Sequence, residues 1–351
     1  MSRGKDLHMP NRQAGLSTLQ KAKDAFRVNG AVCGSESIGC KAGQEKAIIA
    51  GRTTAMQRST LLFHHGSYQK LWQQAGLIQV GPHVADGPDS LRLTDLSVAG
   101  LQTVLRRRGW AVQGVLLQYT DPFLLRSAPL RGINQWAGPR ILACGDLHHG
   151  PNPIATLQRY CSTEQHHAVL LTFNPIMLET VQQYLSIPVR SLAPTFFRYP
   201  TTTPSPTPEM KLLHVGSLGN HHPQRRQIVE ALMRRQKIPF CHATTASPEE
   251  AAQLYAKHAL ILNIPLNRDL NHRVFEIMAA GVPQVIFGDP SLLGRNSKMA
   301  NRPDLFWTQS IEELEKLVME LVSKKDILQA IPVHKPPYWD LKELLKQALS
   351  P

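Results

Sequence analysis

Short apolar runs separated by helical stretches constrain the fold of this chain more than any other feature. The runs include STLLF at 59–63, PRILACGD at 139–146, KLLHVGS at 211–217 and LILNI at 260–264. Between them lie stretches with helical periodicity, such as LSVAGLQTVLRRRG at 96–109 and SIEELEKLVMELV at 310–322. The apolar runs lack period-two alternation, which is typical of parallel strands buried on both faces. The sequence therefore predicts an α/β protein with parallel sheets.

A proline- and threonine-rich stretch, RYPTTTPSPTPEMK at residues 198–211, interrupts this alternation once. Such a composition is typical of linkers between domains. We therefore predict a first Rossmann-like domain at 58–200, a linker at 201–210 and a second Rossmann-like domain at 211–351, with the two domains facing a cleft. Ligands of such sheets bind beyond the carboxyl ends of the strands, so the chemistry is expected in the turns that follow strands.

The first 57 residues differ in character from the rest of the chain. They are polar, basic and weakly periodic, so we expect a flexible N-terminal segment at 1–57. The first residues lack the apolar core of a signal peptide, and no apolar run approaches the roughly 18 residues that a membrane span needs. These features predict a cytoplasmic protein.

The chain is strongly basic, with 39 Lys and Arg against 26 Asp and Glu, a formal net charge of +13. Such a charge attracts nucleic acid, acidic lipid headgroups or phosphorylated small molecules. The positive residues are spread along the chain and do not form one block. The five cysteines are scattered without a C-x-x-C pair, so neither a zinc site nor a disulfide framework is indicated.

A glycine-containing turn at 214–227, HVGSLGNHHPQRRQ, leads from a predicted strand into a helix. Gly216, Ser217 and Gly219 let backbone N–H groups approach a phosphate, and the helix N-terminus favours negative charge. Arg225 and Arg226 can add charge-assisted hydrogen bonds to the same group. The pattern matches neither a P-loop nor G-x-G-x-x-G, so an ordinary strand-to-helix turn remains the alternative.

The stretch NIPLNRDLNHRVFEIMAAGVPQVIFGD at 263–289 places two charged residues on an otherwise apolar helix. Arg273 and Glu276 lie three residues apart and therefore share one face. They can form a surface ion pair of little energetic value. Alternatively, Glu276 faces the ligand and accepts hydrogen bonds from two adjacent hydroxyls of a ribose, because a carboxylate has two acceptor oxygens.

Histidines follow two predicted strands of the first domain. Asp146, His148 and His149 come after one strand, and His64 and His65 come after another. Aspartate or histidine can activate an acceptor hydroxyl as a general base, so Asp146, His148 and His149 are the candidate catalytic residues. A divalent metal site is the competing interpretation. No H-E-x-x-H or comparable spacing supports it, and we predict no bound metal.

The segment from 263 to 289 resembles the carboxy-terminal region of GT-B glycosyltransferases with a family 1-like C-terminal domain. It is most similar to the CgeB-like, spore-maturation group, in which an Asn/Asp-rich loop precedes R-x-F-E-x-x-A-x-G. The resemblance is specific over about residues 245–345 and only architectural before the linker. It implies a GT-B fold and a nucleotide-sugar donor whose ribose Glu276 binds.

The same resemblance implies that the glycine turn and the arginines bind the phosphates of the donor. The implied donor-binding residues are Gly216, Ser217, Gly219, Arg225, Arg226, Asp269, Asn271, Arg273 and Glu276. Many retaining relatives carry a second glutamate eight residues before the first, where this chain has Arg268. Asp269 or Asn271 is a candidate to take over that contact.

The function expected from these features is transfer of a sugar from a nucleotide-sugar donor to a glycan, lipid or protein acceptor. The donor is a substrate, and no further cofactor is expected. A non-catalytic nucleotide-sugar-binding protein of the same fold is the alternative. A nucleic-acid-binding protein is less favoured, because aromatic residues are only 6% and are not interleaved with basic ones. Peripheral association with an anionic membrane is a further expectation from the charge.

Overall fold

The fold is described from a computed structural model. It covers residues 60–66, 69–72, 77–110, 112, 114–192, 197–219, 222–266, 269–294, 299, 302–333 and 341–350. The segment predicted at 1–57 and Arg268 lie outside these described residues.

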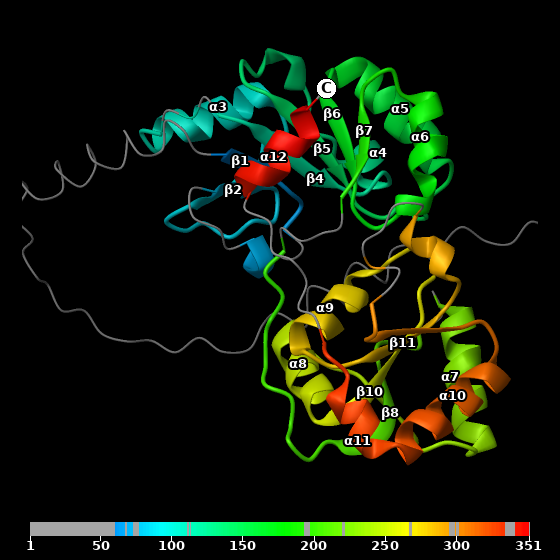
Figure 1. Cartoon of the computed structure of the whole chain (residues 1–351). Helices are drawn as coiled ribbons and strands as arrows, with labels where there is room; N and C mark the ends of the chain where they lie inside the picture. Colours follow the sequence, from blue (N-terminus) through cyan, green and yellow to red (C-terminus); the bar gives the residue numbers. More distant parts are fainter. Residues whose placement is uncertain are drawn as a thin grey trace, which may run out of the picture. The chain divides into compact units, whose positions relative to one another are not determined.

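The first sheet has seven parallel strands in the order β3-β2-β1-β4-β5-β6-β7 (Figure 1). The strands are β1 (Thr60–Phe63), β2 (Leu77–Gly81), β3 (Ser90–Arg92), β4 (Leu116–Thr120), β5 (Arg140–Cys144), β6 (Ala168–Leu171) and β7 (Val189–Ser191). The order of the strands reverses between β1 and β4. Such a switch point is where open parallel sheets bind ligands.

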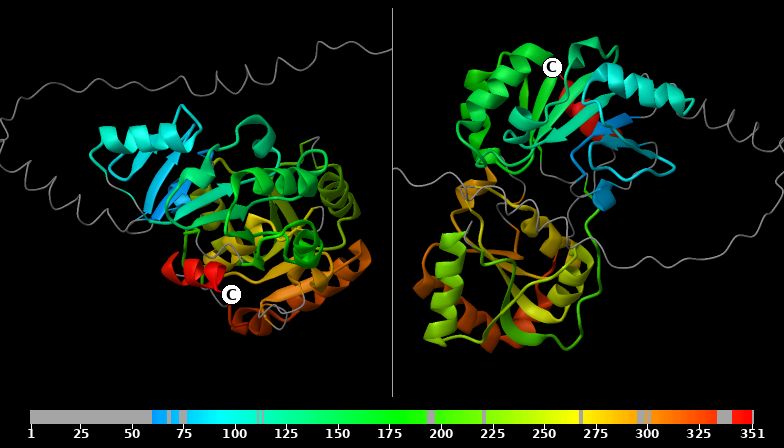
Figure 2. Two further views of the ribbon diagram at one scale, coloured as in Figure 1. Left: turned by 90° about the horizontal axis from the view of Figure 1, so that it is seen from above. Right: turned by 180° about the vertical axis from the view of Figure 1, so that it is seen from behind.

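Helices and short 3-10 turns cover both faces of the first sheet. The helices are α3 (Val98–Arg107), α4 (Leu124–Ser127), α5 (Pro153–Glu164) and α6 (Leu178–Tyr184), and the turns are η1 (Gln69–Trp72), η2 (Ile133–Gln135) and η3 (Pro175–Met177). Figure 2 shows α5 and α6 side by side, and the two helices are in contact. In β1, Leu61 and Phe63 join the core cluster under α3 and α5, whereas Leu62 joins the cluster on the opposite face. Each such buried side chain contributes about 1.5–3 kcal/mol.

The second sheet has five parallel strands in the order β12-β11-β10-β8-β9. The strands are β8 (Glu209–Val215), β9 (Phe240–Ala243), β10 (His258–Asn263), β11 (Gln284–Phe287) and β12 (Leu305–Thr308). The first strand in sequence, β8, lies between the second and the third, β9 and β10. The switch point of this sheet is therefore between β8 and β10.

The helices of the second sheet are α7 (Pro223–Arg235), α8 (Pro248–Ala256), α9 (His272–Ala280), α10 (Ile311–Ser323) and α11 (Lys325–Ala330), with a 3-10 turn, η4 (Pro290–Leu293). Buried residues of α7, α10 and α11 form one cluster, and those of α8 form another with Ile277 and Ala280 of α9. A capping box starts α10, because Ser310 accepts from the Glu313 N–H and the Glu313 carboxylate accepts from the Ser310 N–H. Together these elements confirm the predicted fold class of two parallel α/β sheets.

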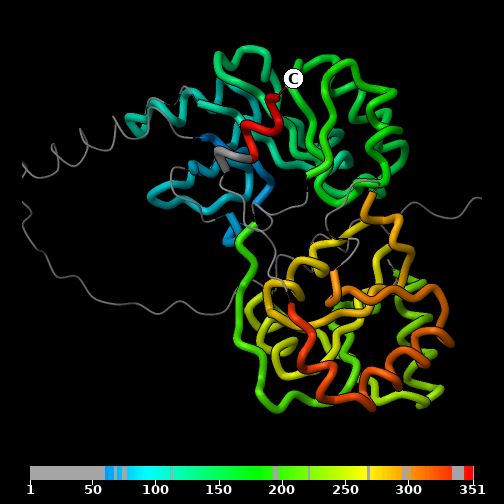
Figure 3. The backbone as a smooth tube through the Cα atoms, viewed as in Figure 1, coloured from blue at the N-terminus to red at the C-terminus, as the bar shows by residue number. Residues whose placement is uncertain are grey.

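The last helix, α12 (Leu341–Leu349), contacts β6 of the first sheet (Figure 1). Leu344, Leu345 and Ala348 belong to the same core cluster as Leu170 of β6. The backbone tube in Figure 3 shows this helix, in red, beside the first sheet. The stretch predicted as the second domain, 211–351, thus supplies elements that pack on both sheets.

Contacts also join the turn after β6 to the start of α9. The backbone N–H of Leu270 donates to the carbonyl of Phe173 at 2.7 Å, and the Tyr199 hydroxyl lies 2.7 Å from Nδ1 of His272. The ring of Phe173 packs 4.3 Å from that of His272 between centroids. These contacts fix the N-terminus of α9, which carries the arginine and glutamate singled out in the sequence.

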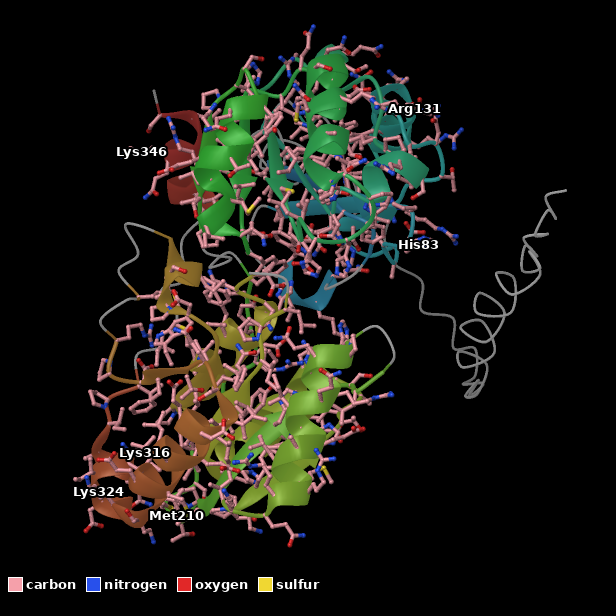
Figure 4. All side chains as sticks on the ribbon, turned by 90° about the vertical axis from the view of Figure 1, so that its right-hand side faces the viewer. His83, Arg131, Met210, Lys316, Lys324 and Lys346 are labelled. Atoms are coloured by element: carbon pink, nitrogen blue, oxygen red, sulfur yellow. The ribbon has the colours of Figure 1, made fainter. Side chains whose placement is uncertain are left out.

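The basic side chains labelled in Figure 4 come from separate elements. Arg131 precedes η2, Lys316 is on α10, Lys324 follows it, and Lys346 is on α12. All four are exposed. Their separation agrees with the prediction that the positive charge is spread along the chain. In the part of the chain that the structure describes, no helix combines the length and apolarity required to cross a membrane.

Candidate active site

The turn after β8 brings an arginine side chain against the backbone at the switch point of the second sheet. A Cβ added to Gly216 would lie 2.6 Å from Nη2 of Arg273, which is closer than real Cβ atoms approach other atoms. Glycine at 216 is therefore required for the guanidinium of Arg273, in the first turn of α9, to occupy this position. This places a cation where parallel sheets bind their ligands.

Several buried polar atoms around this point have no hydrogen-bond partner among the described residues. They are Nε of Arg225, Nη1 of Arg273, Nε2 of His214, Nδ2 of Asn263 and Oδ1 of Asn271. An unpaired buried polar atom costs about 1–3 kcal/mol. Three of these five atoms are donors, two of them on arginines, so the switch point fits an anionic ligand that offers acceptor atoms.

The switch point also carries an excess of positive charge. Burial and the neighbouring Arg273 lower the pKa of Arg225 to about 10, and Asp269 acts in the opposite direction. Burial and the same Arg273 lower the pKa of His214 to about 3, so this histidine is neutral at pH 7. Two arginine side chains held close together, one of them 7% exposed, favour a bound anion.

Other predicted donor-binding residues hold the turn itself. Oγ of Ser217 accepts from the N–H of Gly219 at 3.1 Å, and Nε of Arg226 donates to the carbonyl of Leu218 at 2.7 Å. Helix α7 begins directly after this turn, with Pro223 at its first position. Ser217, Gly219 and Arg226 therefore shape the turn, whereas Arg225 reaches the end of β10, where its Nη2 donates to the carbonyl of Ile264.

Glu276 lies one helical turn after Arg273 and is partly buried. Burial raises the pKa of Glu276, and the positive charge of Arg273 opposes that shift. Arg273 itself is hydrogen-bonded to the buried hydroxyl of Tyr255 on α8. The arginine thus belongs to the interior of the switch point, and the two residues do not form the simple surface ion pair that the sequence also allowed.

The three candidate catalytic residues lie together in the turn after β5. Nε2 of His149 is 3.3 Å from Oδ2 of Asp146, and the rings of His148 and His149 are 4.1 Å apart between centroids. Asp121, after β4, stabilises this turn by accepting the backbone N–H of Asp146 at 2.9 Å. A Cβ on Gly145 would overlap with that Asp121 carboxylate, so glycine is required there too.

The surroundings of this turn shift the pKa values of Asp146 and Asp121 in opposite directions. Burial acts to raise the pKa of Asp146, but its hydrogen bond from His149 and the nearby histidines outweigh burial and lower it. Burial and the negative charge of Asp146 raise the pKa of Asp121 to about 6. The hydrogen bond to Asp146 is also the main cause of the raised pKa of His149. Asp146 is therefore ionised at neutral pH and stabilises the protonated form of His149.

His148 links the two switch points. Its Nδ1 lies 3.7 Å from Oδ2 of Asp269, a residue of the loop between β10 and α9 that is 3% exposed. Oδ1 of Asp269 accepts the backbone N–H of Leu266 at 3.0 Å. Burial and the charge of Asp146 raise the pKa of Asp269 to about 7. His148 and Asp269 thus bring the turn after β5 into contact with the loop between β10 and α9, called the donor loop below.

The same turn can also hold a divalent ion. Asp146, His148 and His149 each offer one ligand atom, and these atoms lie within 4.8 Å of one another. Two imidazoles and a carboxylate suit zinc and several other transition metals. The expectation that no metal is required stays a prediction.

A cavity of about 470 Å³ opens at the switch point of the first sheet. Its lining comes from the turns after β1, β4 and β5 and consists of His64, His65, Tyr119, Thr120, Asp121, Phe123, Leu124, Asp146, His149 and Gly150. This volume lies in the usual range of small-molecule sites. The two histidine-containing turns, after β1 and after β5, thus line one cavity.

Sequence reasoning missed His214, Asn263 and Asp121. His214 and Asn263 are fully buried polar residues in β8 and β10, next to the switch point. A histidine and an asparagine inside apolar runs were the available signal, since buried polar groups need partners. Asp121 directly follows the apolar run of β4, so the rule that directed attention to Asp146 applied to it equally.

Comparison with known proteins supports the resemblance in the carboxy-terminal part. Residues 217–331 match the family profile described as "Glycosyl transferase-like". A search of curated proteins finds no match. The CgeB-like subgroup stays a prediction.

Three solved structures illustrate the similarity of the backbone. Sucrose-phosphate synthase from Thermosynechococcus elongatus is 10% identical with a TM-score of 0.49, over 79% of this chain and 95% of that one. HepE from Anabaena, in complex with UDP and glucose, is 12% identical with a TM-score of 0.48, over 84% and 96%. The lipopolysaccharide outer core galactosyltransferase WaaB in its apo form is 10% identical with a TM-score of 0.46, over 82% and 98%. At such identities no site residue is carried over to this chain.

Proposed function

We propose that this protein is a glycosyltransferase of GT-B type that moves a sugar from a nucleoside diphosphate sugar to an acceptor hydroxyl. The observation that carries the proposal is the group of buried, unpartnered donors of Arg225 and Arg273 beside Gly216. A diphosphate offers the acceptor oxygens that such donors lack. The glycosyltransferase-like profile match over residues 217–331 supports the same proposal independently.

In this proposal the diphosphate lies at the switch point between β8 and β10. Arg273 and Arg225 bind its oxygens and stabilise the negative charge that develops on the leaving group. Glu276, one turn further along α9, accepts the hydroxyls of the ribose. Asn271 and Asp269 lie in the same loop and contact the donor, with Asp269 in the place of the glutamate that many relatives have.

The acceptor hydroxyl is activated by the turn after β5. Nε2 of His149 donates to Asp146, which leaves a lone pair on Nδ1 of the neutral imidazole. That nitrogen takes the proton of the acceptor hydroxyl, and the ionised Asp146 stabilises the imidazolium that forms. His148 contacts Asp269 and thereby orients the catalytic turn relative to the donor loop. This step requires no metal and no further cofactor.

The experiment is a thermal-shift and isothermal titration series on the full chain with UDP, GDP and ADP and the corresponding nucleosides. We expect one diphosphate to bind and its nucleoside to bind at least tenfold more weakly. Arg225→Ala should lower the diphosphate affinity by roughly 10–100-fold, because a charge-assisted contact is lost. Arg234→Ala, an exposed residue at the far end of the same helix, is the matched control and should change nothing.

Transfer is then separated from mere binding. Release of free sugar or of a glycosylated product from the nucleotide sugar of the selected base identifies an enzyme. If a diphosphate binds but no donor is turned over with any glycan, lipid or protein acceptor offered, the protein is a non-catalytic binder. If no diphosphate binds, the assignment of the switch point is wrong.

A further inference from the structure

The cavity at the first switch point differs in charge from the protein as a whole. This difference bears on which acceptor the cavity can bind. The chain as a whole carries a net charge of +13, which by itself favours an anionic acceptor. Yet the residues that line the cavity include two aspartates, Asp121 and Asp146, and neither lysine nor arginine is among them. The local charge therefore runs against the charge of the chain.

One histidine of the cavity, His65, adds an acceptor atom and no positive charge. Nε2 of His65 donates to the carbonyl of Ala128 at 2.9 Å, so the other nitrogen, Nδ1, carries a lone pair. This Nδ1 is buried and has no hydrogen-bond partner among the described residues. Burial also lowers the pKa of His65, which keeps it neutral at pH 7. The cavity therefore presents hydrogen-bond acceptors, namely Nδ1 of His65 and two carboxylates, and suits a ligand that supplies donors.

An exposed aromatic ring stands beside these acceptors. Phe123 is 40% exposed although it belongs to the lining, and its ring packs edge-on against that of His149 at 5.8 Å between centroids. Glycine at 150, with φ +78°, allows the close approach of the two turns, because a Cβ there would lie 3.2 Å from Cβ of Phe123. The electron-rich face of such a ring attracts the slightly positive C–H groups on the apolar face of a pyranose.

We propose that this cavity binds a neutral, hydroxyl-rich acceptor, namely a sugar unit without phosphate or carboxylate. Its hydroxyls donate to Asp121, Asp146 and His65, and its apolar face packs against Phe123. An anionic group would meet two carboxylates with no arginine or lysine to compensate for them. The inference rests on the proposed function, because it identifies the cavity as the acceptor site of the same transfer reaction.

Asp121 allows a test that separates charge from structure. Its side chain accepts the N–H of Asp146, and an asparagine oxygen at the same position accepts the same bond. Asp121→Asn therefore keeps the turn after β5 and removes one negative charge from the cavity. Asp89→Asn is the matched control, since Asp89 is exposed and precedes β3 of the same sheet.

The experiment measures binding of matched sugar pairs to the full chain by saturation-transfer NMR and titration. The probes are glucose, galactose and N-acetylglucosamine, each compared with its own 6-phosphate. We expect at least one neutral sugar to bind tenfold or more tightly than its phosphate. Asp121→Asn and Phe123→Ala should each weaken that binding about tenfold, with Asp89→Asn unchanged.

The result that overturns the inference is tighter binding of the phosphates, binding of neutral sugars that neither variant alters, or no binding of any neutral sugar. Diphosphate binding is measured in the same samples. If it is intact while the sugar result fails, only the acceptor inference is wrong. If diphosphate binding itself is absent, the proposed function fails first.

Discussion

The two switch points of this protein share a topology and differ in charge. At the second sheet, Arg273 of α9 lies against Gly216, and Arg273 and Arg225 of α7 carry buried donors that have no partner among the described residues. At the first sheet, two aspartates and three histidines line an open cavity. Both positions follow from strand order alone, whereas the side chains decide what each can bind. The difference teaches that one fold can offer a cationic site for a leaving group and an acidic site for a nucleophile.

The largest expected effect comes from removing the carboxylate of Asp146 at the first switch point. Asp146→Asn should lower turnover by roughly 10²–10⁴-fold, because the imidazolium of His149 loses its stabilising charge. The pKa of His149 is raised chiefly by Asp146, so the pH profile of the residual activity should shift to lower pH. Steady-state kinetics against pH checks both effects. Unchanged turnover would remove Asp146 from the catalytic step.

The next largest effect is expected from a substitution that tests the close contact between Gly216 and Arg273 at the second switch point. A methyl group on Gly216 would meet Nη2 of Arg273 at 2.6 Å, so Gly216→Ala must displace the guanidinium. We expect the affinity for a nucleoside diphosphate to fall roughly 10–100-fold as that contact is lost. Titration calorimetry measures it, and circular dichroism verifies the fold. Wild-type affinity in a folded Gly216→Ala protein would show that Arg273 does not bind the ligand.

Many of the elements that form the two switch points could be predicted from the sequence. The strands β1, β5, β8 and β10, which lead to the two switch points, were predicted from apolar runs. A helix that carries Arg273 and Glu276 was predicted where α9 lies. Other elements were missed. The strands β2 and β3 are only five and three residues long, and α5 begins after a proline-rich turn without a capping side chain.

The finer features of the site could not come from the sequence, because they depend on tertiary contacts. That Arg225 reaches the interior while its neighbour Arg226 holds the turn depends on which face of α7 meets the sheet. The contact of His148 with Asp269 joins residues more than a hundred positions apart. The packing of α12 on the first sheet likewise follows no local signal.

A moderate effect on stability is expected at the residue that links the two switch points. The folded pKa of Asp269 is about 7 against an ordinary value of 3.8, so between pH 4 and 7 the folded protein holds a proton that the unfolded chain has released. Unfolding free energy therefore falls as pH rises through this window. Asp269→Asn does not titrate, and its stability relative to the wild type should rise by roughly 1–4 kcal/mol from pH 4 to 8.

Thermal or denaturant unfolding of both proteins across that pH range measures the difference. Taking the difference cancels the buried histidines, whose lowered pKa values act in the opposite sense and destabilise the fold in acid. A difference that stays constant with pH would mean that Asp269 is ionised throughout.

The smallest expected effect concerns metal. If His149 acts as the general base and Asp146 as its partner, treatment with a chelator should leave turnover within about twofold of the untreated enzyme. Elemental analysis of the purified protein serves as the control. Loss of activity that one divalent ion restores would instead assign Asp146, His148 and His149 as metal ligands.

The central claim is that the second switch point binds the nucleoside diphosphate and the first performs the chemistry. The most direct test is titration of the selected diphosphate, together with donor turnover, in Arg273→Ala and Asp146→Asn. We predict that Arg273→Ala loses about 100-fold or more in diphosphate affinity. Asp146→Asn should bind the diphosphate within twofold of the wild type and lose turnover. Equal diphosphate affinity in Arg273→Ala and the wild type would contradict the account.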